Sequence, residues 1–305
     1  MKKTIVIFGA NSQDGYYLTD LYTKKGYDVL GISRTGAGLQ GDVASFKFVK
    51  EIVRRYKPEL IFHLAAKSTT RHEALFENHK TIGTGTLNIL EVVYRWHPAC
   101  KVFFAGSGLQ FTNRGEPIYE TDPFDASSAY STERIHSAYA ARYFRSIGVM
   151  TYVGYLFHHE SPLRKPTHVS QKIVQAVKRI ASGSNEKIGL GDISVEKEWA
   201  FAGDIAEGIA VLVGQDHVFE AVIGTGKAYA IKDWLKICFA SIGKDWTSHV
   251  MLKNGFSAEY KRLLSNPQTM FSLGWRPKVE LAELAELMLH NGSDKCEECV
   301  LIMKK

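Results

Sequence analysis

The sequence predicts an α/β protein in which a doubly wound parallel sheet is followed by a smaller C-terminal lobe. Three observations support this prediction. Short apolar runs alternate with amphipathic stretches between residues 4 and 155, as strands alternate with crossover helices in a parallel sheet. A turn bounded by Gly9 and Gly15 joins the first apolar run to the first amphipathic stretch. After residue 157 helix-like stretches dominate, and the strand-like segments become short.

The first half of the chain contains the elements of the predicted sheet. Residues 4–8 are continuously apolar, as expected of a strand buried on both faces. In the helix that follows, Tyr17, Leu18, Leu21 and Tyr22 share one face, and Gly26 ends it. Further strands are expected at residues 28–33, 60–66, 100–105 and 149–155, and further helices at residues 82–95 and 129–146. This succession predicts a Rossmann-like sheet.

The second half of the chain predicts the smaller lobe. Helices are expected at residues 169–182, 205–213 and 231–242, with a strand at residues 219–223. We therefore divide the chain into a core of residues 1–157, to which some later elements return, and a lobe of residues 158–305. The lobe is expected to cover the open end of the sheet, where such folds bind ligands.

Composition excludes several classes of protein. The net charge is +6 and charged residues make up 23% of the chain, but the basic clusters are short, so no nucleic-acid partner is expected. No apolar run has membrane-spanning length. The N-terminal apolar run is too short for a secretion signal, which predicts a cytoplasmic protein. Cys296 and Cys299 form an isolated C-x-x-C pair, and no metal site is predicted from it.

The turn after the first strand predicts a binding site for a dinucleotide. It reads Gly9, Ala10, Asn11, Ser12, Gln13, Asp14 and Gly15. Glycines let the backbone N–H groups at a helix N-terminus approach a pyrophosphate closely. Ser12 adds a side chain where a third glycine is usual. A glycine turn that binds no ligand is the alternative.

Two further segments favour a nicotinamide dinucleotide. Ser33 and Arg34 end the second strand, where an Asp or Glu would bind the ribose hydroxyls of NAD. A hydroxyl and a cation suit a 2′-phosphate instead, so NADP is predicted and NAD is left open. Leu64, Ala65 and Ala66 follow the third strand and allow the backbone to approach the cofactor.

Several motifs are shared with a known family. They are Gln13–Asp14–Gly15, the runs 63–66, 120–124 and 157–162, Tyr130 with Arg134, Leu190–Gly191 with Trp199, and the run 224–226. With these motifs the chain resembles an extended short-chain dehydrogenase/reductase. It is most similar to the branch that contains GDP-mannose 4,6-dehydratases and GDP-4-keto-6-deoxyhexose reductases, and the resemblance extends to about Trp275.

The resemblance implies roles for particular residues. Tyr130 exchanges a proton with the sugar oxygen, Ser107 hydrogen-bonds that oxygen, and Arg134 stands where the family has a lysine that binds the cofactor ribose. Asp42 and Val43 match a pair that lies at the adenine edge. The substrate implied is a GDP-linked sugar, and a homo-oligomer, dimer or tetramer, is expected. Substrate-binding residues are expected to be Ser68, Ser107, His158, Glu160, Ser161, Lys172 and Lys197.

Two departures from the family pattern decide the predicted reaction. Arg134 keeps the positive charge of the usual lysine but does not readily release a proton. Leu109 replaces the glutamate that acts as acid and base in dehydration. We therefore predict an NADP-dependent reductase of a GDP-linked 4-keto sugar in bacterial polysaccharide synthesis. The alternatives are a divergent sugar-nucleotide epimerase or dehydratase, and a catalytically weak protein that binds nucleotide sugars.

Overall fold

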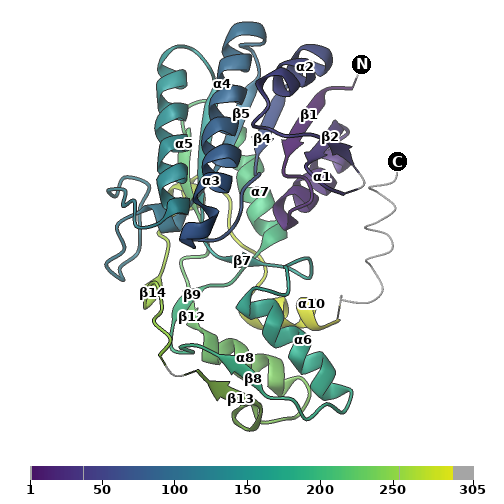
Figure 1. Ribbon diagram of the computed structural model, residues 1–305, viewed down its shortest axis with the longest axis vertical. Helices are drawn as coiled ribbons and strands as arrows, with labels where there is room; N and C mark the ends of the chain where they lie inside the picture. Colours follow the sequence, from purple (N-terminus) through teal and green to yellow (C-terminus); the bar gives the residue numbers. More distant parts are fainter. Residues whose placement is uncertain (1, 37, 254, 291–305) are drawn as a thin grey trace.

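A computed structural model describes residues 2–36, 38–253 and 255–290 and confirms the predicted fold class (Figure 1). Its main sheet has seven strands in the order β11-β6-β5-β4-β1-β2-β3, and every neighbouring pair is parallel. The strands are β1 (Thr4–Phe8), β2 (Asp28–Ser33), β3 (Leu39–Gln40), β4 (Leu60–His63), β5 (Lys101–Ser107), β6 (Thr151–Leu156) and β11 (Glu220–Ile223).

Helices cover both faces of this sheet, which explains the continuous apolar run of β1. Val6 and Phe8 belong to a core cluster on the face covered by α2 (Phe46–Tyr56), α4 (Gly85–Trp96) and α5 (Ala129–Ser146). Ile5 and Ile7 belong to the opposite cluster, under α1 (Gln13–Lys24) and α7 (Ala202–Val213). Successive side chains of a strand point to opposite faces, so both faces of β1 are apolar.

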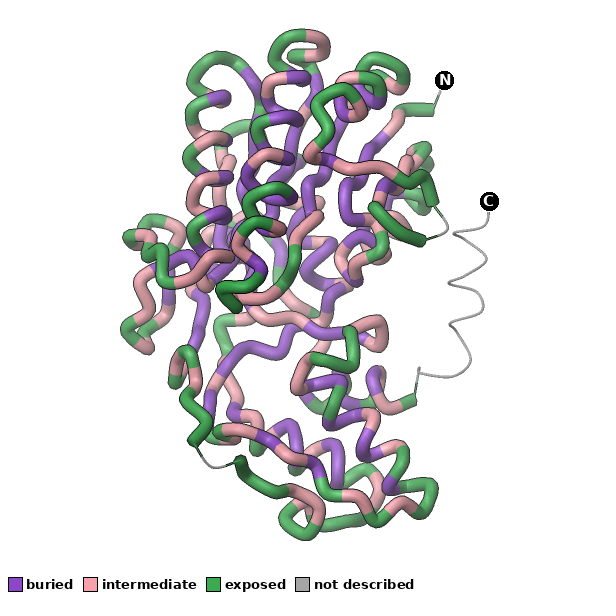
Figure 2. Tube along the Cα trace, in the orientation of Figure 1, coloured by how far each residue is buried: buried purple, intermediate pink, exposed green. Residues whose placement is uncertain are grey.

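The second lobe packs around its own core, below the sheet in Figure 1. The indole rings of Trp199 and Trp234 stack there with centroids 4.8 Å apart. Three helices surround them, α6 (Val169–Ala181), α8 (Ile231–Ala240) and α10 (Leu281–His290). Figure 2 shows the buried interior of the sheet and of the lobe. The short strands are β7 (His159–Glu160), β8 (Ile188–Leu190), β9 (Glu196–Glu198), β10 (Ala200–Phe201), β12 (Ala228–Ala230), β13 (Val250–Leu252) and β14 (Arg262–Leu263).

Short helical segments connect these elements. They are η1 (His72–Ala74), α3 (Leu75–Asn78), η2 (His79–Thr84), η3 (Gly108–Gln110), η4 (Trp246–His249) and α9 (Gln268–Ser272). The helix expected at residues 82–95 begins at Gly85, because a π-helical turn occupies 79–84. α2 and β3 were not predicted.

Three further expectations from the sequence concern a membrane span, the C-terminal cysteines and the later elements of the core. Among the described residues, no helix is both long and apolar enough to cross a membrane. Cys296 and Cys299 lie outside the described residues. Two elements from the second half of the chain belong to the main sheet layer: β11 is its edge strand, and α7 packs on β6 and β11.

Candidate active site

The turn between β1 and α1 has the geometry of a phosphate-binding loop. Gly9 has a φ of +94°, and a Cβ there would lie 2.7 Å from the backbone nitrogen of Ala65. A Cβ at Gly15 would lie 2.7 Å from the Cα of Ala10. Only glycine fits such close approaches. The turn therefore packs directly on the segment after β4, and the approach of Leu64, Ala65 and Ala66 to a cofactor stays a prediction.

Ser12 stands where the middle glycine is usual, and it caps the N-terminus of α1. Its hydroxyl accepts a hydrogen bond from the N–H of Gly15 at 3.0 Å and donates one to the carbonyl of Gly9 at 2.8 Å. The serine thus stabilises the turn and the start of α1. Asn11 is exposed, and its amide donates to the carbonyl of Thr35 at 3.3 Å.

The side chains of Gln13 and Asp14 face the second lobe. The amide of Gln13 donates to the carbonyl of His159 at 3.0 Å and accepts from the hydroxyl of Ser161 at 2.9 Å. Asp14 pairs with the His159 imidazole at 2.8 Å. The contribution of Gln13 and Asp14 to a cofactor is therefore their backbone, and Ser161 is buried against Gln13.

The end of β2 contains an ion pair that the sequence did not predict. Arg34 pairs with Glu77 of α3 at 2.8 Å, and Lys67 lies 3.9 Å from the same carboxylate. The hydroxyl of Ser33 donates to the carbonyl of Thr35 at 2.7 Å. Two cations thus share one carboxylate at the site expected for the 2′-phosphate.

The residues expected at the adenine edge lie beside α4. Asp42 pairs with Lys80 at 2.8 Å. Val43 is buried, and its carbonyl accepts a hydrogen bond from the amide of Asn88 at 3.0 Å. Ser68, predicted to bind substrate, is exposed after β4.

The three predicted catalytic residues belong to β5 and to the first turns of α5, which packs on that strand. Ser107 ends that strand, and its hydroxyl accepts a hydrogen bond from the N–H of Leu109 at 3.2 Å. Tyr130 lies in the first turn of α5, and the guanidinium of Arg134 lies 5.0 Å from its ring centre. Arg134 donates from Nη1 to the carbonyl of Ala105, which anchors α5 to β5 two residues before Ser107.

Arg134 is a buried cation with unused hydrogen-bonding capacity. It is 4% exposed, and its buried Nε has no hydrogen-bond partner among the described residues. His63, at the end of β4, is 1% exposed. Burial first, and then the charge of Arg134, lower the pKa of His63 to about 3. The imidazole is therefore neutral and adds no second positive charge beside Arg134.

A second cluster of charges lies at the junction with the lobe. The buried carboxylate of Glu160 accepts a hydrogen bond from Ser170 at 2.7 Å and lies 3.2 Å from Arg164 and 3.6 Å from Lys197. Burial opposes its charged form, but the charges of Arg164 and Lys197 outweigh burial and lower its pKa. Lys197 is 6% exposed. In this structure the ammonium group of Lys197 balances the charge of Glu160. The contact with phosphate that was predicted for Lys197 stays a prediction.

His158, another predicted substrate residue, is also in this interior. Its Nε2 lies 3.1 Å from the hydroxyl of Tyr260. Burial, and then the charge of Lys197, hold its pKa well below its usual 6.5. The imidazole is therefore neutral.

Lys172 lies in a basic pocket on the outer side of the lobe. The pocket has a volume of about 330 Å³ and is formed by α6, β8 and β13. Lys172, Lys187 and Lys253 line it, and Glu186, the one carboxylate in its lining, pairs with Arg179 at 2.8 Å. The pocket thus keeps an excess of positive charge, which suits an anionic group.

Comparison with known proteins defines the family. The family model for GDP-mannose 4,6 dehydratase matches residues 6–288. This chain belongs to the GDP-mannose 4,6-dehydratase family. GDP-mannose 4,6 dehydratase 1 of Arabidopsis thaliana is 29% identical over 325 residues, covering 94% of this chain and 89% of that protein.

Solved structures agree on the fold of this family member. The dTDP-glucose 4,6-dehydratase of Bacillus anthracis, solved with NAD, aligns with a TM-score of 0.84 at 16% identity over 99% of this chain and all of that one. RMD of Pseudomonas aeruginosa, solved with NADPH, aligns with a TM-score of 0.82 at 15% identity, over 95% and 99% of the two chains. The resemblance seen in the sequence is confirmed.

This member of the dehydratase family carries an apolar group at position 109. The side chain of Leu109 packs partly buried against the core cluster under α5. A leucine neither donates nor accepts a proton, so it does not perform the acid–base step for which dehydration needs a carboxylate.

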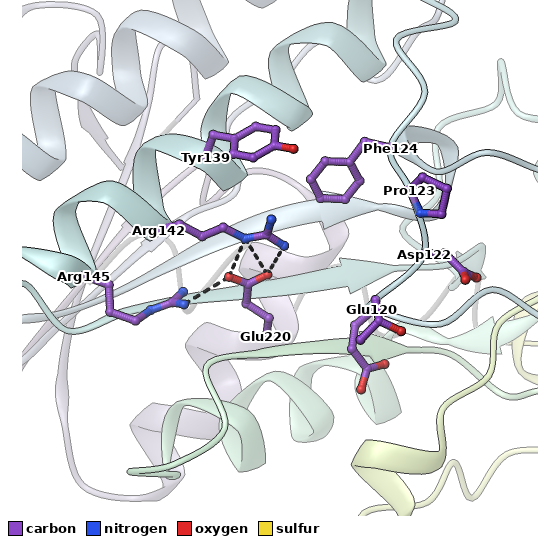
Figure 3. Close-up of a pocket in the computed structure, with 9 residues that line it drawn as sticks. Glu120, Asp122, Pro123, Phe124, Tyr139, Arg142, Arg145 and Glu220 are labelled. Carbon is purple, nitrogen blue, oxygen red and sulfur yellow. Dashed lines mark hydrogen bonds and ion pairs between the residues drawn. The ribbon is translucent and has the colours of Figure 1, made fainter.

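A larger pocket lies at the β11 edge of the main sheet, along the later turns of α5 (Figure 3). Its volume is about 560 Å³. Glu220 accepts hydrogen bonds there from Arg142 at 2.7 Å, Arg145 at 3.0 Å and Tyr155 at 2.6 Å. Through these contacts Glu220 of β11 fastens α5 to β6 and β11, so we assign the pocket to the fold.

Proposed function

We propose that this protein is an NADP-dependent oxidoreductase that acts at C4 of a GDP-linked sugar, with reduction of a 4-keto sugar as its net reaction in bacterial polysaccharide synthesis. One observation carries the proposal. The buried guanidinium of Arg134 lies beside the ring of Tyr130 and bonds the end of β5, and no residue that the structure describes bonds its Nε. An unsatisfied buried donor is costly to keep, and the hydroxyls of a cofactor ribose would satisfy it.

The residues present fit a nicotinamide dinucleotide. The turn from Gly9 to Gly15 leaves no room for a Cβ at either end, and it leads directly into the N-terminus of α1, where backbone N–H groups would bind a pyrophosphate. Arg134 would bind the ribose next to the nicotinamide. Bound there, the cofactor would supply the hydride.

The chain's own residues handle the oxygen and the proton. Ser107 would donate a hydrogen bond to the C4 oxygen and orient the carbonyl. As C4 receives the hydride, Tyr130 would give its phenolic proton to that oxygen, which becomes a hydroxyl group. The positive charge of Arg134 would stabilise the phenolate that remains.

The charges at the end of β2 support NADP over NAD. Arg34 and Lys67 share the single carboxylate of Glu77, so this corner keeps a net positive charge. A 2′-phosphate would compete with Glu77 for Arg34, and a guanidinium binds phosphate in bidentate geometry. NAD is the alternative, with the ribose hydroxyls bound by Glu77.

The family and the charge of the lobe support a GDP-linked sugar. The relatives are named for GDP-mannose, and the pocket at Lys172 has an excess of positive charge. A nucleoside diphosphate carries negative charge that such a pocket attracts.

A second candidate is 4,6-dehydration of the same class of sugar. The family match over residues 6–288 and the names of the relatives favour it. Leu109 argues against it, because removal of the C5 proton needs an acid–base group at that position or a substitute from elsewhere.

Two incubations distinguish the candidates. In the first, a GDP-4-keto-6-deoxyhexose is mixed with NADPH, and oxidation of NADPH is followed by absorbance. In the second, GDP-mannose is mixed with NADP, and the products are analysed by mass spectrometry for loss of water. We expect turnover in the first incubation only. Turnover in the second would establish dehydration. Binding of NADPH and of the GDP-linked sugar without turnover in either incubation would instead support a protein that only binds nucleotide sugars.

A further inference from the structure

His159 lies between two hydrogen-bond acceptors. Its Nε2 is 2.8 Å from the carboxylate of Asp14, and its Nδ1 is 2.7 Å from the carbonyl oxygen of Phe157. A carbonyl oxygen and a carboxylate only accept, so both ring nitrogens satisfy their partners only when both carry protons. The geometry therefore fits the imidazolium form of His159.

The charges around His159 act in opposite directions. Burial and the charge of Arg164 disfavour a positive charge on this ring, while Asp14 and the carbonyl of Phe157 favour it. The attraction of Asp14 prevails and the pKa of His159 is raised. Burial likewise opposes the charge of Asp14, but His159, Arg164 and Arg134 together lower the pKa of that carboxyl.

This ion pair is one part of a connection between the two halves of the molecule. Gln13 bonds both the carbonyl of His159 and the hydroxyl of Ser161. We call the side chains of Gln13, Asp14, His159 and Ser161 the latch. Gln13 and Asp14 begin α1, directly after the glycine turn. His159 and Ser161 belong to the segment of β7, which lies between the sheet and the lobe in Figure 1.

From β7 the connection continues into the lobe. His159 pairs with Ala200 and Glu160 with Phe201 in a parallel two-stranded ladder. β10 follows β9, which carries Lys197, and Lys197 lies 3.6 Å from Glu160. A displacement of the first turn of α1 would therefore move the backbone that positions the charges of the lobe.

We propose that the latch is a positioning device that couples the cofactor turn to the substrate lobe, so that NADPH and the nucleotide sugar bind more tightly together than singly. The inference rests on the proposed function for the identity of its two ligands. None of the four side chains needs to touch the substrate, because they act through β7 and β10. Coupling between binding sites is typically about 5-fold or more in affinity.

Two variants with opposite changes in charge test the coupling. Asp14→Asn removes a negative charge, and His159→Gln removes a positive one. If the pair acted only through its electric field, the first variant would bind anions more tightly and the second less tightly. If the latch positions the lobe, both weaken GDP binding in the presence of NADPH. Asp20→Asn is the matched control, since Asp20 is on the same helix and, within the described ranges, its ion pair is with exposed Lys24 at 2.7 Å.

The dissociation constant of GDP is measured with and without NADPH by calorimetry. We expect NADPH to tighten GDP binding about 5-fold or more in the parent and in Asp20→Asn, and to have little effect in the two latch variants. Hydrogen–deuterium exchange gives a second readout that needs no GDP. NADPH is expected to slow exchange at residues 159–161 and 200–201 in the parent and the control only.

The possible results distinguish a failure of the coupling proposal from a failure of the proposed function. Equal coupling and equal protection in all four proteins would overturn the latch and leave the proposed function standing. Opposite effects of the two latch variants on GDP affinity would also overturn it. A parent that binds NADPH but not GDP would contradict the nucleotide-sugar proposal, while the exchange measurement would still decide whether cofactor binding reaches β7. A parent that does not bind NADPH would overturn both.

Discussion

Replacement of Arg134 by methionine is expected to abolish activity with little loss of stability. Methionine is unbranched and of similar length, so it fills much of the same space. The variant loses a hydrogen bond from a charged group to the carbonyl of Ala105, about 1.5–3 kcal/mol, and a cation–π contact with Tyr130, about 1–2 kcal/mol. Both losses lower the free energy of unfolding, because Arg134 is 4% exposed and water does not replace these contacts.

A gain of similar size opposes these losses. Within the described part of the chain Arg134 forms no ion pair with a carboxylate, and the charge of Asp14 is bound by His159. Burial of a cation costs several kcal/mol when no close partner compensates it. The methionine variant is relieved of that cost. We therefore expect its free energy of unfolding to differ from the parent's by less than about 1 kcal/mol.

Urea denaturation and NADPH oxidation measure the two quantities. The rate of hydride transfer is expected to fall by about 10²-fold or more, because Tyr130 loses the cation that stabilises its phenolate. A loss of more than about 2 kcal/mol in stability would show that Arg134 is structural and would refute the argument. Arg134→Lys separates charge from shape: activity holds or rises if only the cation matters, and falls if the guanidinium binds ribose in its own geometry.

Four further predictions concern other parts of the protein. Tyr130→Phe should slow hydride transfer by about 10²–10⁴-fold with cofactor affinity nearly unchanged in a fluorescence titration; turnover at the parent rate would remove Tyr130 from the mechanism. Glu77→Gln frees Arg34 and should increase the preference for NADPH over NADH, whereas an unchanged ratio would exclude Arg34 from the 2′-phosphate. The pKa of His159 is raised above its usual 6.5, so the stability that its pairing with Asp14 provides is complete below pH 6.5 and is lost as pH rises through the raised pKa; the difference in Tm between the parent and His159→Gln should therefore narrow with rising pH, and a constant difference would contradict the imidazolium. The chain should form at least a dimer through α4 and α5, which a monomer in light scattering at micromolar concentration would disprove.

Local patterns in the sequence were enough to predict the fold class and most strands of the main sheet. The apolar run of β1 and the glycine turn depend on the two-residue period of a strand and on the space a Cβ needs. Tyr130 and Arg134 are four residues apart, so any helix places them on one face. The family could be recognised for the same reason, since its motifs are short and contiguous.

The partners of these residues depended on the tertiary structure. Arg34 meets Glu77, 43 residues further along the chain, and Asp14 meets His159, 145 residues further along. No short-range period links such positions, because the order of strands in the sheet decides which segments become neighbours. Lys197 shows the same limit: its 3.6 Å contact with Glu160 joins two segments 37 residues apart, and the phosphate contact expected from the family resemblance stays a prediction. A buried charge is stabilised by an opposite charge, and only the assembled lobe determines where that charge is.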